Sequence, residues 1–289
     1  MKNMQPITSI YGLSYHTNIE VHHFHDKYIV LYDDHRCILN ALFEAKKLKL
    51  FNSPPNIIFF DRHDDACDPD IRKQELLEQW HVEKIEDVSS KDFWSFVEFD
   101  LNILDDDWLL AGMELGLINH AVVIGQYENS NMRSKDYEYK SSDGKVHEMY
   151  DISHINHSID SRGCLGDSVI KQPYYENIRD IFEYNQPPYG RYDKFSKEVT
   201  KPFVLDFDLD CFTTTCEGNT YAWPETIFRE MYYDNIDVRT FMQQLIYRST
   251  LITICREPNC CGGIGESNRI LWYLDNYFFE GCLKTNPIQ

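Results

Sequence analysis

Short runs of β-branched and aromatic residues alternate along this chain with stretches of helical periodicity. The runs that predict strands are Tyr28–Leu31, Ile57–Phe60, Ala121–Ile124, Pro202–Leu205 and Leu251–Cys255. The stretches that predict helices are Cys37–Leu50, Asp70–Trp80, Lys91–Asn102, Trp108–Leu117, Trp223–Tyr233, Val238–Tyr247 and Gly265–Phe279. Strands that alternate with helices favour a mostly parallel sheet covered on both faces. We therefore expect an α/β, doubly wound fold, with residues 1–289 in a single domain.

Two further segments stand outside this alternation. Tyr137–Met149 predicts a hairpin, because the polar stretch Ser141–Gly144 divides it into two halves. His22–His25 alternates poorly for a strand. A solvated segment is the favoured interpretation of these histidines, and metal binding is the alternative.

The charge, the apolar runs and the cysteines of the chain limit the partners that we expect it to bind. The chain has 28 lysines and arginines against 47 aspartates and glutamates, which gives a formal net charge of −19. Nucleic acids and anionic membranes attract clustered basic residues, so neither is an expected partner. No apolar run approaches the roughly 18 residues that a membrane span needs. The nine cysteines form no C-x2-C pair, and we expect a reduced, cytoplasmic setting.

Aspartates and histidines, residue types that ligate metals, follow three of the expected strands. They are Asp33, Asp34 and His35 after the first, Asp61, His63 and Asp65 after the second, and Asp206, Asp208 and Asp210 after the fourth. In open α/β sheets, ligands bind outside the carboxyl ends of the strands. Buried carboxylates without partners are costly, and divalent cations relieve that cost. Solvated turns are the alternative interpretation, but the combination of three such strand ends favours a metal centre.

The order of these motifs, a histidine, then D-x-H-x-D, then D-x-D, resembles the arginase/ureohydrolase superfamily. The closer resemblance is to the arginase-like group that includes the peptide arginases of ribosomal peptide biosynthesis. His35 and Asp61 are 26 residues apart, and Asp65 and Asp206 are 141 apart. The second spacing is longer than in ordinary arginases, so the resemblance implies an insertion around residues 126–200 of an arginase-like fold.

The resemblance implies two Mn²⁺ ions per chain, with Fe²⁺ or Zn²⁺ less favoured. One ion would be held by His35, Asp61, Asp65 and Asp206. The other would be held by Asp61, His63, Asp206 and Asp208, so that Asp61 and Asp206 bridge. Asp210 and Asp34 are expected to support these ligands rather than to bind metal.

The resemblance also assigns substrate and catalytic roles. Glu257 follows the strand Leu251–Cys255 and would pair with a guanidinium, whereas a surface Glu257 paired with Arg256 is the alternative. Asp65 would orient the hydroxide and relay its proton. Trp108 is a candidate for substrate contact, and His81 or His154 is a candidate proton shuttle.

These features predict a hydrolase that converts arginine to ornithine and urea. Arginases of free arginine carry an Asn/Ser-bearing segment after D-x-H-x-D, and here Ala66–Asp70 lacks it. The expected substrate is therefore an arginine-containing precursor peptide, and the protein could form a homo-oligomer. The alternatives are a deacylase or another amidine hydrolase on the same scaffold, and a metal-stabilised peptide-binding protein without activity.

Overall fold

One large sheet takes strands from most of the described length of the chain. The computed structural model describes residues 19–101, 106–125, 137–152, 203–216 and 218–285. Eight strands form this sheet in the order β1-β2-β10-β7-β3-β4-β6-β5. Their bounds are β1 Glu20–Phe24, β2 Lys27–Tyr32, β3 Asn56–Phe60, β4 Ala121–Ile124, β5 Tyr137–Lys140, β6 Val146–Ile152, β7 Phe203–Asp208 and β10 Leu251–Cys255. A separate two-stranded sheet pairs β8, Thr213–Cys216, with β9, Asn219–Ala222.

The six inner strands of the main sheet, from β2 to β6 in the sheet order, are parallel. The two edge strands, β1 and β5, pair antiparallel with their neighbours. Parallel strands end at one edge, so the residues that follow β2, β3, β7 and β10 meet there. This arrangement places distant parts of the sequence at a single edge.

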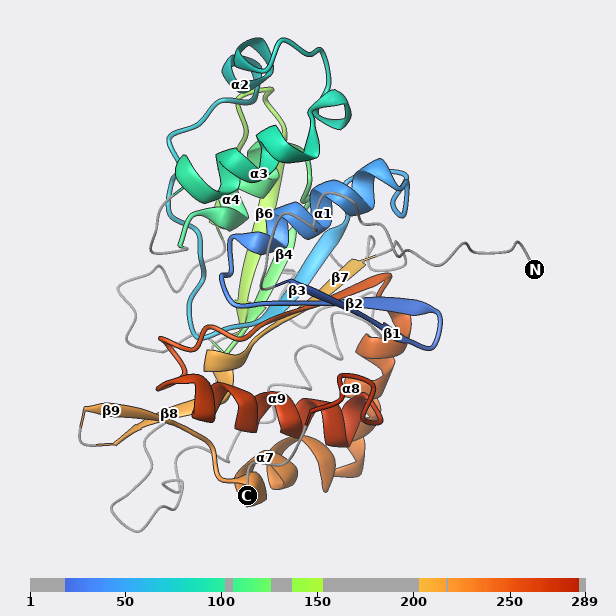
Figure 1. Cartoon of the computed structure of the whole chain (residues 1–289), viewed down its shortest axis with the longest axis vertical. Helices are drawn as coiled ribbons and strands as arrows, with labels where there is room; N and C mark the ends of the chain where they lie inside the picture. The colour runs from blue at the N-terminus through green and yellow to red at the C-terminus, as the bar shows by residue number, and fades with distance from the viewer. Residues whose placement is uncertain (1–18, 102–105, 126–136, 153–202, 217, 286–289) are drawn as a thin grey trace.

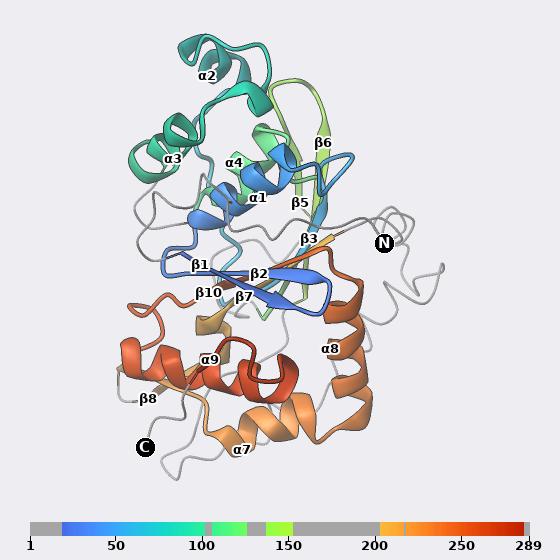
Figure 2. The ribbon, with the colours of Figure 1, turned by 45° about the vertical axis from the view of Figure 1, so that its right-hand side comes forward.

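Helices cover both faces of the sheet (Figures 1 and 2). One face carries α1 Cys37–Lys47, α3 Ser90–Phe99 and α4 Trp108–Glu114, with the short α2 Lys73–Gln79 and a 3₁₀ turn at Ile85–Asp87 further out. The other carries α7 Glu225–Phe228, a π-helical turn at Arg229–Tyr233, α8 Ile236–Arg248 and α9 Ile264–Phe278. A 3₁₀ turn, Leu209–Phe212, connects β7 to β8.

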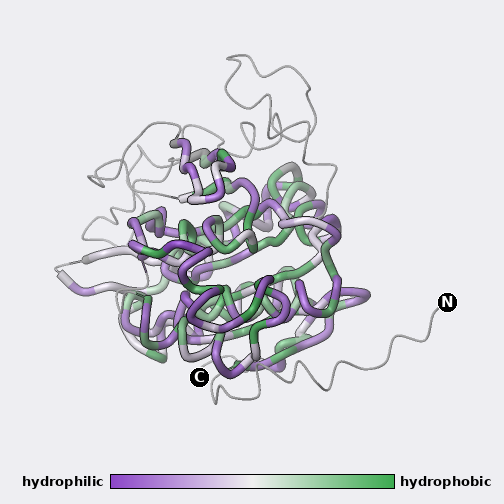
Figure 3. Tube along the Cα trace, turned by 90° about the horizontal axis from the view of Figure 1, so that it is seen from above, coloured by the Kyte–Doolittle hydropathy of each residue, from purple (hydrophilic) through white to green (hydrophobic). Residues whose placement is uncertain are grey.

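Two apolar clusters flank the sheet, because successive strand side chains point to opposite faces. In β3, Ile58 and Phe60 pack in the α7–α9 layer, whereas Ile57 and Phe59 pack in the α1–α4 layer. All five β3 residues are buried, which explains the continuous apolar run. Figure 3 shows hydrophobic segments concentrated in the middle of the trace.

The α/β prediction with a mostly parallel sheet and helices on both faces is confirmed. The hairpin expected over Tyr137–Met149 is present as β5 and β6. The interpretation of His22–His25 was wrong in part, since His22, His23 and Phe24 belong to the edge strand β1. Most of the insertion expected at 126–200 lies outside the described residues. Within the described residues, no helix is both long and apolar enough to cross a membrane.

Candidate metal centre

His35 stands at the centre of a buried group of carboxylates at the carboxyl edge of the sheet. Its Nδ1 lies 3.0 Å from an oxygen of Asp65, 3.0 Å from one of Asp208 and 3.4 Å from one of Asp61. The His35 ring is fully buried, as are these three aspartates. Two other segments of the chain, the one that follows β3 and the end of β7, thus converge on an imidazole nitrogen that follows β2.

A second group of ligand atoms adjoins the first. Asp61, His63 and Asp210 offer atoms that all lie within 4.8 Å of one another. His63 Nδ1 lies 3.3 Å from Asp210 Oδ2 and 3.6 Å from Asp61 Oδ1. The His63 side chain is half exposed, so this group opens towards solvent while the His35 group is sealed. Asp61 belongs to both groups, as a bridging ligand must.

Asp206 takes a different position from the one the sequence suggested. Its Oδ2 lies 2.9 Å from His35 Nε2, the nitrogen opposite the cluster. Its Oδ1 accepts hydrogen bonds from the hydroxyls of Tyr32, at 3.2 Å, and Thr253, at 2.5 Å. Both oxygens are therefore engaged behind the histidine, and Asp206 does not belong to any of the groups of candidate ligand atoms among the described residues, so its bridging role stays a prediction. A carboxylate on the far nitrogen fixes the orientation of a ligating histidine.

The register of β7 explains this placement. The strand continues to Asp208, and Asp206 pairs with Phe59 of β3 and Thr253 of β10 inside the sheet. Asp208 is the last residue of the strand, and Asp210 lies in the 3₁₀ turn beyond it. Asp208 Oδ1 accepts the backbone N–H of Asp210 at 3.0 Å, which fixes the two relative to each other. Asp208 and Asp210, rather than Asp206 and Asp208, are thus the D-x-D pair at the sheet edge.

Trp108 lies behind the ligands instead of in contact with a substrate. Its side chain is completely buried, and its indole N–H donates to Asp65 Oδ2 at 2.6 Å. The ring also packs against His35 with centroids 4.7 Å apart. The structure therefore corrects the expected substrate contact, since α4 presents Trp108 to two ligand residues.

Glu257 joins the same centre from the end of β10. One of its oxygens lies within 4.8 Å of ligand atoms of His35 and Asp208. The alternative pairing with Arg256 does not occur, because Arg256 Nε donates to Asp33 at 2.5 Å and its Nη1 approaches Glu20. The backbone φ of Glu257 is +33°, and that of Asp65 is +47°. Non-glycine residues in this region are uncommon, and such strain collects at functional sites.

Two other expected residues, Asp34 and His81, do not join the cluster. Asp34 forms an ion pair with Arg36 at 2.6 Å and accepts the Arg36 backbone N–H. His81 is exposed just beyond the end of α2, where its backbone N–H bonds to Glu78. His154 lies outside the described residues. The described residues thus provide no histidine at the site besides His35 and His63.

Several supporting residues were missed by sequence reasoning. Tyr32 and Thr253 hold Asp206, and Arg62 donates its backbone N–H to Asp210 Oδ1 at 3.3 Å. The Arg62 guanidinium reaches the hydroxyls of Thr213 and Thr215 at the base of the β8–β9 hairpin. Thr253 could have been recognised as a supporting residue, because it is the hydroxyl residue of the otherwise apolar strand β10 and a buried hydroxyl requires a partner.

Burial and the neighbouring charges shift the pKa values of the residues in the cluster. Burial raises the pKa of Asp61 well above its ordinary value, and Asp65 and Asp208 add to this. Burial, then Asp208, raises the pKa of Asp210 to about 7, and burial followed by Asp208 raises the pKa of Glu257 to about 10. Burial opposes the charged form of His35, but the carboxylates, led by Asp206, raise its pKa well above the usual range. Without cations, Asp61, Asp210, Glu257 and His35 thus take up protons more readily than the same groups do in water.

The donor set fits divalent metal ions. His35 Nδ1, Asp61 Oδ2 and Asp210 Oδ2 are buried atoms without a hydrogen-bond partner. Buried polar atoms of this kind are rare and indicate an unseen partner. Carboxylate oxygens with imidazole nitrogens suit Mn²⁺, Fe²⁺ or Zn²⁺. His35, Asp61, Asp65 and Asp208 thus form a cluster able to bind metal, and the His63 group extends it.

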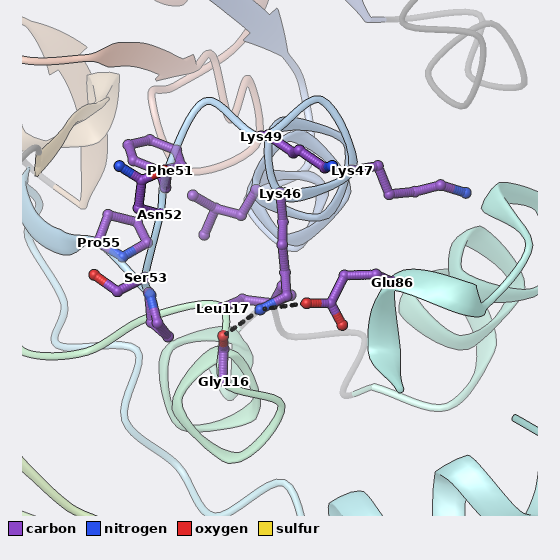
Figure 4. Close-up of a pocket in the computed structure, with 12 residues that line it drawn as sticks. Lys46, Lys47, Lys49, Phe51, Asn52, Ser53, Pro55, Glu86, Gly116 and Leu117 are labelled. Atoms are coloured by element: carbon purple, nitrogen blue, oxygen red, sulfur yellow. Dashed lines mark hydrogen bonds and ion pairs between the residues drawn. The ribbon is translucent and has the colours of Figure 1, made fainter. Parts of the chain in front are cut away.

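A cavity of about 420 Å³ lies at the opposite, amino edge of the sheet. The loop Phe51–Pro55, which precedes β3, and the end of α1 line it (Figure 4). Lys46 points across this cavity to Glu86, at 3.3 Å, and to the Gly116 carbonyl, at 3.4 Å. Its central lysine already has partners, and the cavity is separate from the ligands that follow the strands.

Comparison with known proteins leaves the centre without an assignment. No protein-family model matches the chain, and no curated protein matches it. The chemistry of the site is therefore argued from the geometry of its residues.

Proposed function

We propose that this chain is a binuclear metal hydrolase of the arginase type, which converts arginine side chains of a peptide to ornithine and releases urea. The observation that carries the proposal is the convergence of His35 and three aspartates on one point, with Glu257 beside them. The resemblance of the sequence motifs to ureohydrolases supports the same reaction.

Two manganese ions are proposed at the two groups of ligand atoms. His35, Asp61, Asp65 and Asp208 would hold one, and Asp61, His63, Asp208 and Asp210 would hold the other. Bound divalent ions lower the pKa of water and so supply the hydroxide for hydrolysis near neutral pH. Asp206 keeps the His35 ring oriented for this purpose through its 2.9 Å contact with Nε2.

Glu257 is proposed to bind the guanidinium. A guanidinium is planar and always charged, and it pairs with a carboxylate through two parallel hydrogen bonds. A cation next to Glu257 would hold that carboxylate in its ionised form, since opposite charges favour ionisation. The guanidinium carbon would then lie beside the ligand cluster, with Asp65 placed to hold a proton during the reaction.

The local frame keeps Glu257 in this position. Arg256, its neighbour, is fixed by Asp33 at the end of β2, and the Arg256 backbone N–H bonds to the Tyr32 carbonyl at 2.8 Å. The Cys260 and Cys261 N–H groups both bond to the Glu257 carbonyl at 3.0 Å. Such preorganisation reduces the entropy lost when a substrate is oriented.

The test is incubation of Mn²⁺-loaded protein with synthetic peptides that each contain one internal arginine, and with free arginine. We expect urea, and a mass loss of one cyanamide unit, CN₂H₂, per arginine in the peptides. Peptides with lysine in place of arginine are the control. Absence of urea from every arginine peptide, with the metal bound, would contradict the proposal.

Glu257→Gln separates this reaction from deacylation on the same scaffold. A neutral amide pairs poorly with a guanidinium, so urea release should fall by about 10²-fold or more, as when a buried charged hydrogen bond is lost. Hydrolysis of a neutral acylated amine would persist in the variant. A metal-stabilised binding protein would bind arginine peptides without turnover in either form.

A further inference from the structure

Cys260 brings a thiol to the mouth of the metal centre. Asp210, Glu257 and Cys260 offer ligand atoms that all lie within 4.8 Å of one another. This group shares Asp210 with the His63 group and Glu257 with the His35 group. Like the His63 group, it reaches the surface, since Cys260 is exposed whereas Asp210 is buried.

The turn after β10 gives two adjacent cysteines opposite environments. Cys261 is fully buried, and its thiol bonds to the Arg256 carbonyl at 3.2 Å. Cys260 is the exposed member beside Glu257. Gly262 fixes this turn against the β8–β9 hairpin, because a Cβ there would lie 2.0 Å from the Thr220 carbonyl oxygen. The turn therefore brings Cys260 beside Asp210 and Glu257.

Asp210 has an unsatisfied oxygen at the same place. Oδ1 of Asp210 accepts the Arg62 backbone N–H, whereas Oδ2 is buried and accepts no hydrogen bond from any described residue. His63 Nδ1 lies 3.3 Å from that oxygen, on the ligand side. Asp210 is 1% exposed and this oxygen accepts no hydrogen bond from a described residue, so it is available to ligate a cation.

We propose that Asp210, Glu257 and Cys260 form an additional cation site, which takes a thiophilic divalent ion such as Zn²⁺ and regulates the centre. Thiolate sulfur with carboxylate oxygens is a donor set that zinc accepts and that magnesium and calcium avoid. On binding, the thiol proton leaves to solvent as the sulfur–metal bond forms. The three ligands leave further coordination positions for water.

This site and the guanidinium would exclude each other, a consequence that rests on the proposed function. Glu257 cannot pair bidentately with a guanidinium while it ligates a cation, and two cations at one carboxylate repel each other. Zinc at the mouth would therefore inhibit urea release in competition with the arginine peptide. The enzyme would be active with its inner ions bound and inactive when a thiophilic ion is in excess.

The test uses Mn²⁺-loaded full-length protein titrated with Cd²⁺, a spectroscopic substitute for zinc. Coordination by a thiolate produces an ultraviolet charge-transfer absorption that carboxylates and imidazoles do not give. We expect a saturable signal in the unaltered protein. In Cys260→Ser, the affinity reported by this signal should fall at least about 10-fold, the scale of lost ligand support at metal sites.

Cys67→Ser and Cys282→Ser are the matched controls, because both thiols are partly buried and neither belongs to the group. Both should keep the full signal. Absence of a thiolate signal in the unaltered protein, or an unchanged signal in Cys260→Ser, overturns the site. Glu257→Gln should weaken Cd²⁺ binding while Cys260 stays reactive towards a thiol reagent.

Zinc inhibition of urea release then tests the regulation, with each variant compared to its own rate without zinc. We expect inhibition that rises with zinc and is relieved by peptide, and loss of this sensitivity in Cys260→Ser. If the cation binds Cys260 but zinc does not inhibit urea release, the proposed competition between the cation and the guanidinium is wrong. Because Cd²⁺ binding is read without turnover, a protein that releases no urea refutes the proposed function and still decides the cation site.

Discussion

The carboxyl edge of the main sheet gathers buried carboxylates around a histidine, whereas the ion pair that lines the cavity at the amino edge stays partly exposed. At the amino edge, Lys46 pairs with Glu86 and both side chains remain partly exposed, at 23% and 45%. At the carboxyl edge lie five aspartates of 5% exposure or less, four of them beside the buried His35 ring and the fifth beside His63. Those aspartates are Asp61, Asp65, Asp206, Asp208 and Asp210.

The difference lies in what balances the charge. A partly exposed ion pair is solvated and contributes little to stability. Buried carboxylates in excess of cationic side chains are unfavourable unless they are protonated or bound to cations. The same α/β scaffold therefore carries a partly exposed ion pair at one edge and a buried cluster able to bind metal at the other. We therefore expect variants at the carboxyl edge to weaken metal binding, and a variant at the amino edge to change only the free energy of unfolding.

The largest effect is expected from Asp61→Asn, since Asp61 belongs to both groups of ligand atoms. Loss of its charge should weaken metal binding by at least about 100-fold, because changing a residue that only supports a ligand already costs about 10- to 100-fold. Metal content measured after gel filtration, together with urea release, checks this. Asp34→Asn is the control, because Asp34 pairs with Arg36 outside the cluster. Full metal occupancy in Asp61→Asn would contradict the ligand assignment.

Comparing Asp208→Asn with Asp206→Asn tests which of these two β7 aspartates ligates metal. Asp208 faces His35 Nδ1, whereas Asp206 faces Nε2. We expect Asp208→Asn to lose metal, and Asp206→Asn to retain it with affinity lowered about 10- to 100-fold, as for other residues that orient ligands. Calorimetric titration of the metal-free variants with Mn²⁺ measures both. Equal losses, or a larger loss in Asp206→Asn, would restore Asp206 as a ligand.

Stability should depend on pH in opposite ways with and without metal. The pKa of Asp210 is raised from 3.8 to about 7 in the fold, so the metal-free native state binds a proton that the unfolded chain releases. Its contribution is present below about pH 4 and is lost as the pH rises through 7. The gain in stability on adding Mn²⁺ should instead increase over this range, because the ions replace protons.

Chemical denaturation at several pH values, with and without Mn²⁺, measures these two slopes. Asp210→Asn is the informative comparison, since the amide does not titrate and the metal-free slope should become shallower. If the metal-free protein gained stability between pH 4 and 7 and Asp210→Asn left the slope unchanged, the protonated state of the buried carboxylates would be refuted.

A smaller effect is expected from Trp108→Phe. The change keeps an aromatic ring in contact with His35 but removes the indole N–H that donates to Asp65. Metal affinity should fall by about 10-fold, at the low end for residues that support ligands. Mn²⁺ titration measures this, and near-ultraviolet circular dichroism checks that the fold is kept. An unchanged affinity would mean that the indole hydrogen bond does not tune Asp65.

The smallest effect is expected at the amino edge. Lys46→Met removes the ion pair with Glu86 and should cost no more than about 1 kcal/mol of unfolding free energy. Metal content and urea release should not change. Denaturant unfolding and metal analysis of the same preparation test both parts. A loss of metal in Lys46→Met would remove the distinction between the two edges.

Much of the sheet was predictable because its inner strands are buried on both faces. Continuous apolar runs such as Ile57–Phe60 therefore mark β3 clearly in the sequence. The edge strand β1 was missed, because only Phe24 of its five residues is buried and its pattern is polar. The β8–β9 hairpin was also missed, since its stabilising contacts come from Arg62 and the distant α9 residue Glu266.

The sequence predicted a cluster of histidine and aspartates at the sheet edge, but it misplaced the end of β7. The sequence pattern correctly placed His35, Asp61 and Asp65 beside one another. The predicted end of β7 at Leu205 was three residues short, because acidic residues normally signal the end of a strand. Asp206 is tolerated inside β7 only because Tyr32, Thr253 and His35 satisfy it. These partners come from three other segments and carry no local sequence signal.

Anomalous X-ray scattering from crystals of the Mn²⁺-loaded protein tests the central claim most directly. We expect two scattering peaks, one beside His35 Nδ1 with Asp61, Asp65 and Asp208, and one between Asp61, His63 and Asp210. The absence of a peak at His35 Nδ1 in metal-loaded crystals, or an ion ligated by Asp206 in place of Asp210, would contradict the account.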